Sequence, residues 1–130
     1  MTDRNTIENT FTLEWSKGAQ IILVSAGFDA HERDPLGGMK VTTRGFGLFA
    51  ERLCAVADEI CNGRIVLALE GGSDLEALGE SVAETVGVLA KPSLGAAEFP
   101  VASARGMEIS RVCRDAHARF WPTLGRRIQD

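Results

Sequence analysis

The chain has 130 residues, of which 45% are apolar and 25% are charged, which fits one globular domain with its own core over residues 1–130. Its formal net charge of −4 at pH 7 argues against a broad cationic surface, so neither nucleic acid nor a membrane is an expected partner. No apolar run approaches the ~20 residues that cross a bilayer, and the polar residues after Met1 do not resemble a leader, so we expect a cytoplasmic protein.

The first third of the chain predicts one strand and a long loop. Residues 1–19 follow neither a helical nor a strand pattern and are expected to be irregular. Ile21–Val24 is continuously apolar and rich in β-branched residues, which is typical of a parallel strand covered on both faces. Gly27–Lys40 follows as a loop, with Pro35 and two adjacent glycines as breakers.

The next segment predicts a strand–helix–strand unit. A helix begins at Thr42 or Thr43, either of which can cap it, and ends at Asn62-Gly63. Ile65–Leu69 is a second apolar strand, so the two strands should be parallel and the crossover right-handed. The apolar stripe of this helix comprises Phe46, Phe49, Ala50, Leu53, Ala57 and Ile60.

Two further helices are expected. Ser73 and Glu76 have the spacing of a capping box and predict a helix that stops before Pro92. A last helix spans roughly residues 107–120. The residues expected to be buried are Leu75, Leu78, Val82, Val86 and Leu89 in the first helix, and Ile109, Val112, Cys113, Ala116 and Phe120 in the second.

Both strands lead into loops that carry polar side chains. In a parallel sheet, ligands collect beyond the carboxyl ends of the strands, where residues 27–34 and 70–74 should meet. Asp29 and His31 are two apart and could both touch one metal ion. The alternatives are a hydrogen-bonding loop histidine, which we favour for His31, and a carboxylate that orders the turn for Asp29. Asp34 precedes Pro35 and is assigned to turn chemistry.

The motifs resemble one family. They are Ser25-Ala-Gly-Phe-Asp-Ala-His-Glu-Arg-Asp-Pro-Leu-Gly-Gly38, Val41-Thr-Thr-Arg-Gly-Phe46, Leu67-Ala-Leu-Glu-Gly-Gly-Ser-Asp-Leu75 and, weakly, Phe120-Trp-Pro-Thr-Leu124. Together they resemble the zinc-dependent histone deacetylases, which include acetylpolyamine amidohydrolases and acetoin-utilisation proteins, and most closely the class II-like members. The likeness covers about residues 20–124 and matches only the last third of a family catalytic domain. It implies a partial α/β fold with a three-layer, arginase/deacetylase-like parallel sheet.

The resemblance also implies roles for particular residues. Asp29 matches the third zinc ligand of the family, while an Asp-x-His motif that supplies the other two ligands, and the paired histidines that activate water, match nothing in this chain. Ser73 stands where the family has the tyrosine that stabilises the oxyanion, and its hydroxyl is too short to replace it. Gly71 and Gly72 would let the backbone approach a substrate closely. One carboxylate cannot hold a catalytic zinc ion, which usually has three protein ligands.

The expected function is therefore that of a truncated or stand-alone C-terminal segment of a deacetylase. The parent chemistry is zinc-dependent hydrolysis of N-acetyl amides, in acetyl-lysine or an acetylpolyamine, and we expect the isolated chain to be inactive unless a complementary N-terminal chain completes the site. The alternative is a non-catalytic α/β interaction module that forms homo-oligomers through exposed sheet surfaces. A small domain that binds an anion at the turn of Gly71 and Gly72 is a third reading.

Overall fold

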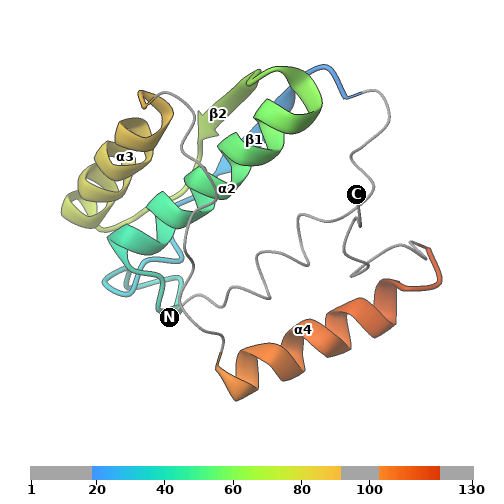
Figure 1. Cartoon of the computed structure of the whole chain (residues 1–130). Coiled ribbons are helices and arrows are strands. Elements are labelled where there is room, and N and C mark those ends of the chain that lie inside the picture. Colours follow the sequence, from blue (N-terminus) through green and yellow to red (C-terminus); the bar gives the residue numbers. More distant parts are fainter. Residues whose placement is uncertain (1–18, 92–102, 121–130) are drawn as a thin grey trace. The chain divides into compact units, whose positions relative to one another are not determined.

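A computed structural model describes residues 19–91 and 103–120 of the chain (Figure 1). The chain forms two compact units, and the described residues 19–91 belong to the first and 103–120 to the second. The expectation of irregular structure before residue 19, and the weak motif after Phe120, lie outside the described residues. Within the described part, no helix combines the length and the apolar composition needed to cross a bilayer.

The first unit is built on a strand–helix–strand unit. It contains β1 (Ile22–Ala26), α2 (Thr43–Cys61) and β2 (Ile65–Leu69). The strands are parallel and in register from Ile22 opposite Ile65 to Ala26 opposite Leu69. The predicted βαβ unit is confirmed, and so is the α/β class.

The ends of α2 follow from local chemistry. Thr42 caps the start, because its hydroxyl accepts a hydrogen bond from the backbone N–H of Gly45 at 3.1 Å. Asn62 ends the helix with a left-handed φ of 54°, and Gly63 continues with φ 72°. The Gly63 N–H then donates to the Ala57 carbonyl at 2.9 Å, which satisfies one of the free carbonyl groups at the end of the helix.

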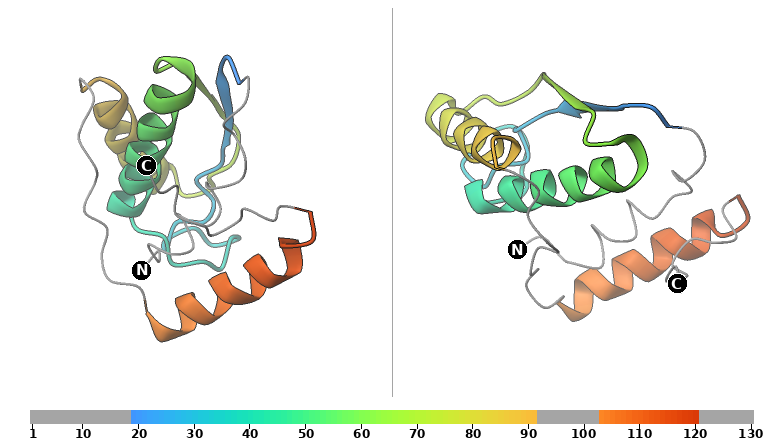
Figure 2. Two further views of the ribbon diagram at one scale, coloured as in Figure 1. Left: turned by 45° about the vertical axis from the view of Figure 1, so that its right-hand side comes forward. Right: turned by 45° about the horizontal axis from the view of Figure 1, so that its top comes forward.

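α2 lies against one face of the sheet, and α3 packs against α2 (Figure 2). Ile22 is buried on the covered face, whereas Leu23 on the other face is 73% exposed and its neighbour Val66 is 50% exposed. The expectation that the first strand is covered on both faces is therefore wrong for the described residues. A continuous apolar run predicts a strand, but it does not show which of its two faces other elements cover. Phe28, Val41 and Phe46 form a separate buried cluster at the carboxyl end of the sheet.

The third helix, α3 (Leu75–Leu89), differs from its prediction in two ways. Its cap is Asp74, whose carboxylate accepts from the Ala77 N–H at 2.8 Å, and not Ser73. Its buried face also differs from the predicted stripe: Ala77, Ser81, Thr85 and Val88 are buried, Leu78 and Val82 are half-buried, and Leu75, Val86 and Leu89 are exposed.

The packing of two helices explains the difference. α2 and α3 pack against each other, and at Gly47 of α2 the Glu84 side chain occupies the space that a Cβ would need, since an added Cβ would lie 2.6 Å from its Oε1. Arg44 forms an ion pair with Glu84 at 3.0 Å across the same contact. A face of small side chains suits the packing of two helices, whereas leucines would hold the helices further apart.

The helix of the second unit, α4 (Ala104–His117), begins earlier than predicted because Ser103 supplies a cap, accepting from the Gly106 N–H at 3.1 Å. Its expected buried face is also wrong. Ile109, Val112, Cys113 and Ala116 are exposed, as is Phe120 beyond the helix. Helical spacing of apolar residues identified the helix but did not establish its burial.

Candidate functional site

The loops that follow β1 and β2 meet at the carboxyl edge of the sheet. The Glu70 N–H bonds to the Ala26 carbonyl at 3.1 Å, and the Phe28 N–H bonds to the Gly71 carbonyl at 2.8 Å. These bonds extend the pairing of the strands beyond their ends. The predicted convergence of the two loops is therefore observed, with Asp29 and the glycine turn side by side.

Asp29 presents an exposed carboxylate beside these glycines. A Cβ added at Gly27 would lie 2.9 Å from Oδ1 of Asp29, and a Cβ added at Gly71 would lie 3.2 Å from the same oxygen. At Gly37 a Cβ would lie 1.8 Å from the Asp29 carbonyl oxygen. Among the described residues, no hydrogen bond or ion pair engages the Asp29 carboxylate. Within residues 19–91 and 103–120, its exposed oxygens therefore have no partner that a ligand would have to displace.

His31 lies nearby but is buried, with 3% of its surface exposed. Its Nδ1 accepts from the Arg33 backbone N–H at 3.1 Å, which leaves Nε2 as the protonated nitrogen of the neutral ring. Nε2 lies 3.2 Å from the Thr43 hydroxyl, and the ring stacks on Phe46 with centroids 6.2 Å apart. To bind a metal, His31 would have to give up one of these hydrogen bonds.

Ser73 follows the glycine turn. Gly72 has φ 142°, a conformation that favours glycine, and an added Cβ would lie 3.0 Å from Cδ1 of Leu78. Ser73 is exposed and its side chain does not cap α3. Its backbone N–H instead donates to Oδ2 of Asp34 at 2.7 Å.

The sequence predicted only part of the role of Asp34. It is 7% exposed, and its Oδ1 accepts from the N–H groups of Leu36 at 2.8 Å and Gly37 at 3.0 Å. The pKa of the Asp34 carboxyl lies below its ordinary value of 3.8, mainly because the Ser73 N–H and then the Leu36 N–H donate to it. Burial opposes this shift, and the backbone N–H groups of Gly37 and, least, Asp74 add to it. The Asp-Pro dipeptide signals the turn, but nothing local signals the bond to Ser73.

The described residues do not by themselves fit a zinc site. Within residues 19–91 and 103–120 there is no group of three or more His, Cys, Asp or Glu side chains that could hold a metal ion. Asp29 supplies one ligand of suitable chemistry, and catalytic zinc needs about three. Any zinc bound at Asp29 would need ligands from elsewhere.

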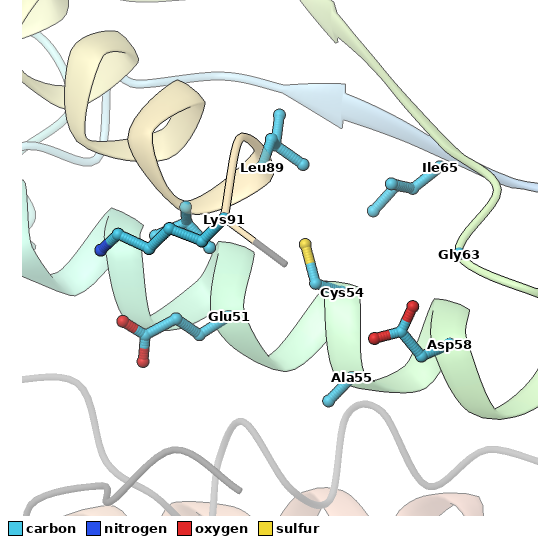
Figure 3. A pocket seen from close by; sticks show the side chains of 9 residues that line it. Glu51, Cys54, Ala55, Asp58, Gly63, Ile65, Leu89 and Lys91 are labelled. Carbon is cyan, nitrogen blue, oxygen red and sulfur yellow. The ribbon is translucent and has the colours of Figure 1, made fainter. Parts of the chain in front are cut away.

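A small cavity of about 110 Å³ lies away from this edge, where α2, β2 and the end of α3 meet (Figure 3). Cys54 and Asp58 line it, together with Glu51 and Lys91. Burial, and secondarily the charge of Asp58, raises the pKa of the Cys54 thiol, so this thiol stays protonated and is a poor nucleophile or metal ligand. The cavity adds no reactive group to the candidate site.

Comparisons with known proteins agree on one family. Residues 12–89 match the family described as "Histone deacetylase domain". The chain is 43% identical over 107 residues to histone deacetylase 18 of Arabidopsis thaliana, covering 80% of this chain. It is 54% identical over 77 residues to histone deacetylase 10, chloroplastic, of Oryza sativa subsp. japonica, covering 58% of this chain.

A solved structure gives the same answer for the fold. The crystal structure of the HDA15 HD domain superposes with a TM-score of 0.62 and 28% identity, over 80% of this chain and 26% of that one. The chain spans only 15% of the Arabidopsis relative and 17% of the rice relative. The matched stretch is thus a small part of each of these proteins.

Proposed function

The chain belongs to the histone deacetylase family, and on this basis we propose that it contributes one ligand, Asp29, to a zinc-dependent deacetylase site that other residues complete. The observation that carries the proposal is the exposed Asp29 carboxylate without an intramolecular partner among the described residues, at the sheet edge where ligands collect. The missing ligands would come from outside the described residues, such as a complementary N-terminal chain.

The chemistry of the completed site would be hydrolysis of an N-acetyl amide, with acetyl-lysine or an acetylpolyamine as substrate class. Zinc, when bound, activates water and polarises the carbonyl. This chain's part would be to hold the ion through Asp29 and to approach the substrate with the backbone of Gly71 and Gly72. Ser73 would leave the developing oxyanion without the donor that the family tyrosine supplies.

The direct test is zinc affinity, measured by competition with a chromophoric chelator. The chain alone should bind weakly, and an equimolar mixture with the deacetylase-domain segment of Arabidopsis histone deacetylase 18 that precedes the matched region should bind at least about tenfold more tightly. Asp29→Ala should abolish that gain, while Asp58→Ala, which changes an exposed carboxylate of α2, should not. A gain that survives Asp29→Ala would refute the proposal.

A second variant tests the oxyanion argument. If the mixture hydrolyses an acetyl-lysine peptide, Ser73→Tyr should raise its kcat by about 10²-fold, the usual effect of one oxyanion donor. Ser73 is exposed, so the larger side chain does not disturb the core. An unchanged kcat would mean that the Ser73 position does not face the reacting carbonyl.

One observation favours a non-catalytic interaction module as the second candidate. Leu23 and Val66 are register partners on the same sheet face, and both are exposed, as are several other large apolar side chains of the unit. A second copy of the chain could cover them. Sedimentation should then show a concentration-dependent dimer that Leu23→Asp disrupts and Leu36→Asp, in an 81% exposed loop position, does not. A monomer at all concentrations would rule this candidate out.

A further inference from the structure

The Asp34 carboxylate joins the two loops of the candidate site. Oδ1 accepts from Leu36 and Gly37, which belong to its own loop. Oδ2 accepts at 2.7 Å from Ser73, which lies 39 residues further along the chain, in the turn before α3. One side chain thus contacts backbone groups of both segments that border Asp29.

The position of this carboxylate is also electrostatically favourable. Ser73 and Asp74 immediately precede α3, so a negative charge at Oδ2 faces the positive end of the helix. The side chain is largely buried, and a buried carboxylate is tolerated only where donors satisfy its oxygens, as three N–H groups do here. A simple turn would need only the two local bonds.

Two contacts lead from Asp34 to Asp29. Gly37, which donates to Asp34, packs so closely on the Asp29 backbone that an added Cβ would lie 1.8 Å from its carbonyl oxygen. Gly71, two residues before Ser73, lies under the Asp29 carboxylate, where a Cβ would be 3.2 Å from Oδ1. Movement of either segment therefore changes the surroundings of Asp29.

We propose that Asp34 is a positioning residue that clamps the Asp29 loop to the turn of Gly71–Ser73 and so fixes the place of the Asp29 carboxylate. The ligand role of Asp29 rests on the function proposed above, whereas the clamp itself can be tested independently. Asp34 touches no reacting group and acts only through the two loops.

The first test compares Asp34→Asn with Asp74→Ala in the full chain. Asparagine keeps one acceptor oxygen but turns an NH₂ group toward one set of N–H donors, so part of the clamp is lost. Asp74→Ala removes the cap of the same helix, at a cost of about 1 kcal/mol, without touching the Asp29 loop. It is therefore a matched control for destabilisation of the start of α3.

The readout is NMR spectroscopy. In Asp34→Asn, amide exchange at Ser73 and Gly37 should accelerate by about tenfold or more, and the carbon-13 signal of the Asp29 carboxyl should shift. In Asp74→Ala, both should stay at their wild-type values. If Asp34→Asn does not fold, Ser73→Pro removes the bond to Oδ2 from its donor side; it should accelerate amide exchange at Gly37 and shift the Asp29 carboxyl signal in the same way. Equal behaviour of the clamp variant and the control would overturn the proposal.

Zinc affinity of the mixture described above separates the two proposals. Asp34→Asn should weaken it by about tenfold, as loss of a supporting hydrogen bond does around metal ligands, and Asp74→Ala should change it less than about twofold. If Asp29→Ala weakens zinc binding and Asp34→Asn does not, the positioning role is wrong. If Asp29→Ala has no effect on zinc affinity, the proposal that Asp29 is a zinc ligand is wrong. The NMR comparison of Asp34→Asn with Asp74→Ala then tests by itself whether Asp34 holds the two loops together.

Discussion

Gly37→Ala offers a sharp test of the loop geometry around Asp29. An alanine Cβ at this position would lie 1.8 Å from the carbonyl oxygen of Asp29 and 2.8 Å from its carbonyl carbon. The nearest atoms are backbone, so no rotamer change can relieve the contact. The loop of Gly37 and the backbone of Asp29 must separate by more than 1 Å to reach an ordinary contact of about 3 Å.

The magnitude follows from the kind of contact. Overpacking against well-packed neighbours typically costs about 1–3 kcal/mol, and a backbone obstacle places this variant at the upper end, near 3 kcal/mol. Separation would also stretch the 3.0 Å bond from the Gly37 N–H to Asp34. With about 4–8 °C per kcal/mol for a unit of this size, a loss near 3 kcal/mol should lower Tm by about 12–24 °C.

Two other glycines provide matched controls, and thermal unfolding followed by circular dichroism measures all three. Gly79 lies in the exposed interior of α3 with no atom within 4 Å of an added Cβ, so Gly79→Ala should stabilise the chain by about 0.5–1 kcal/mol. Gly38 has φ 61° in equally open space, so Gly38→Ala should cost only the left-handed penalty of about 1–2 kcal/mol. A Gly37→Ala variant as stable as wild type would refute the loop geometry.

Three further outcomes are expected. Val88→Ala should lower the free energy of unfolding, measured in urea, by about 1.5–3 kcal/mol, because Val88 is only 4% exposed. Val86 is 54% exposed, so Val86→Ala should change that free energy by less than about 0.5 kcal/mol. Equal costs would contradict the observed buried face of α3. Asn62→Ala should lower stability by about 1 kcal/mol and Asn62→Gly should not, because φ is 54° there; chemical denaturation of the two variants checks this. The pKa of Asp34 is lowered in the folded protein, so its contribution to folding stability is present above pH 3.8 and is lost as the pH falls through the folded pKa. Between pH 5 and pH 2, the Tm of Asp34→Asn should therefore fall less steeply than the Tm of the wild type.

Much of the fold could be predicted because its signals are local. Thr42 and Asn62-Gly63 mark the ends of α2 through capping and left-handed chemistry that involve only a few neighbouring residues. The second strand was predicted with its observed bounds, Ile65–Leu69, because an apolar run between turn residues leaves little alternative. The carboxyl ends of parallel strands share one edge of a sheet, which predicted that residues 27–34 and 70–74 meet, and the two loops do meet there.

The errors concern contacts between elements. The most apolar stripe of α3 was expected to be buried, but α3 packs against α2 and buries a face of mostly small side chains, which leaves Leu75 and Val86 exposed. The capping-box spacing of Ser73 was a reasonable local pattern, yet Asp74 caps the helix and the Ser73 N–H bonds to Asp34 instead. Two candidate caps one residue apart cannot be ranked by spacing alone.

The sequence by itself determined the elements, their order and the residue types at the sheet edge, because each depends on neighbours within about one turn or one strand. It also predicted the parallel pairing, because two apolar strands joined by one helix form a βαβ unit. Only the tertiary structure decided that His31 is buried with both ring nitrogens in contact with protein groups, that the Asp29 carboxylate is exposed, and that Asp34 bridges two loops. The physical reason is that burial and hydrogen-bond partners across 39 residues depend on how closely whole elements pack, which no local pattern records.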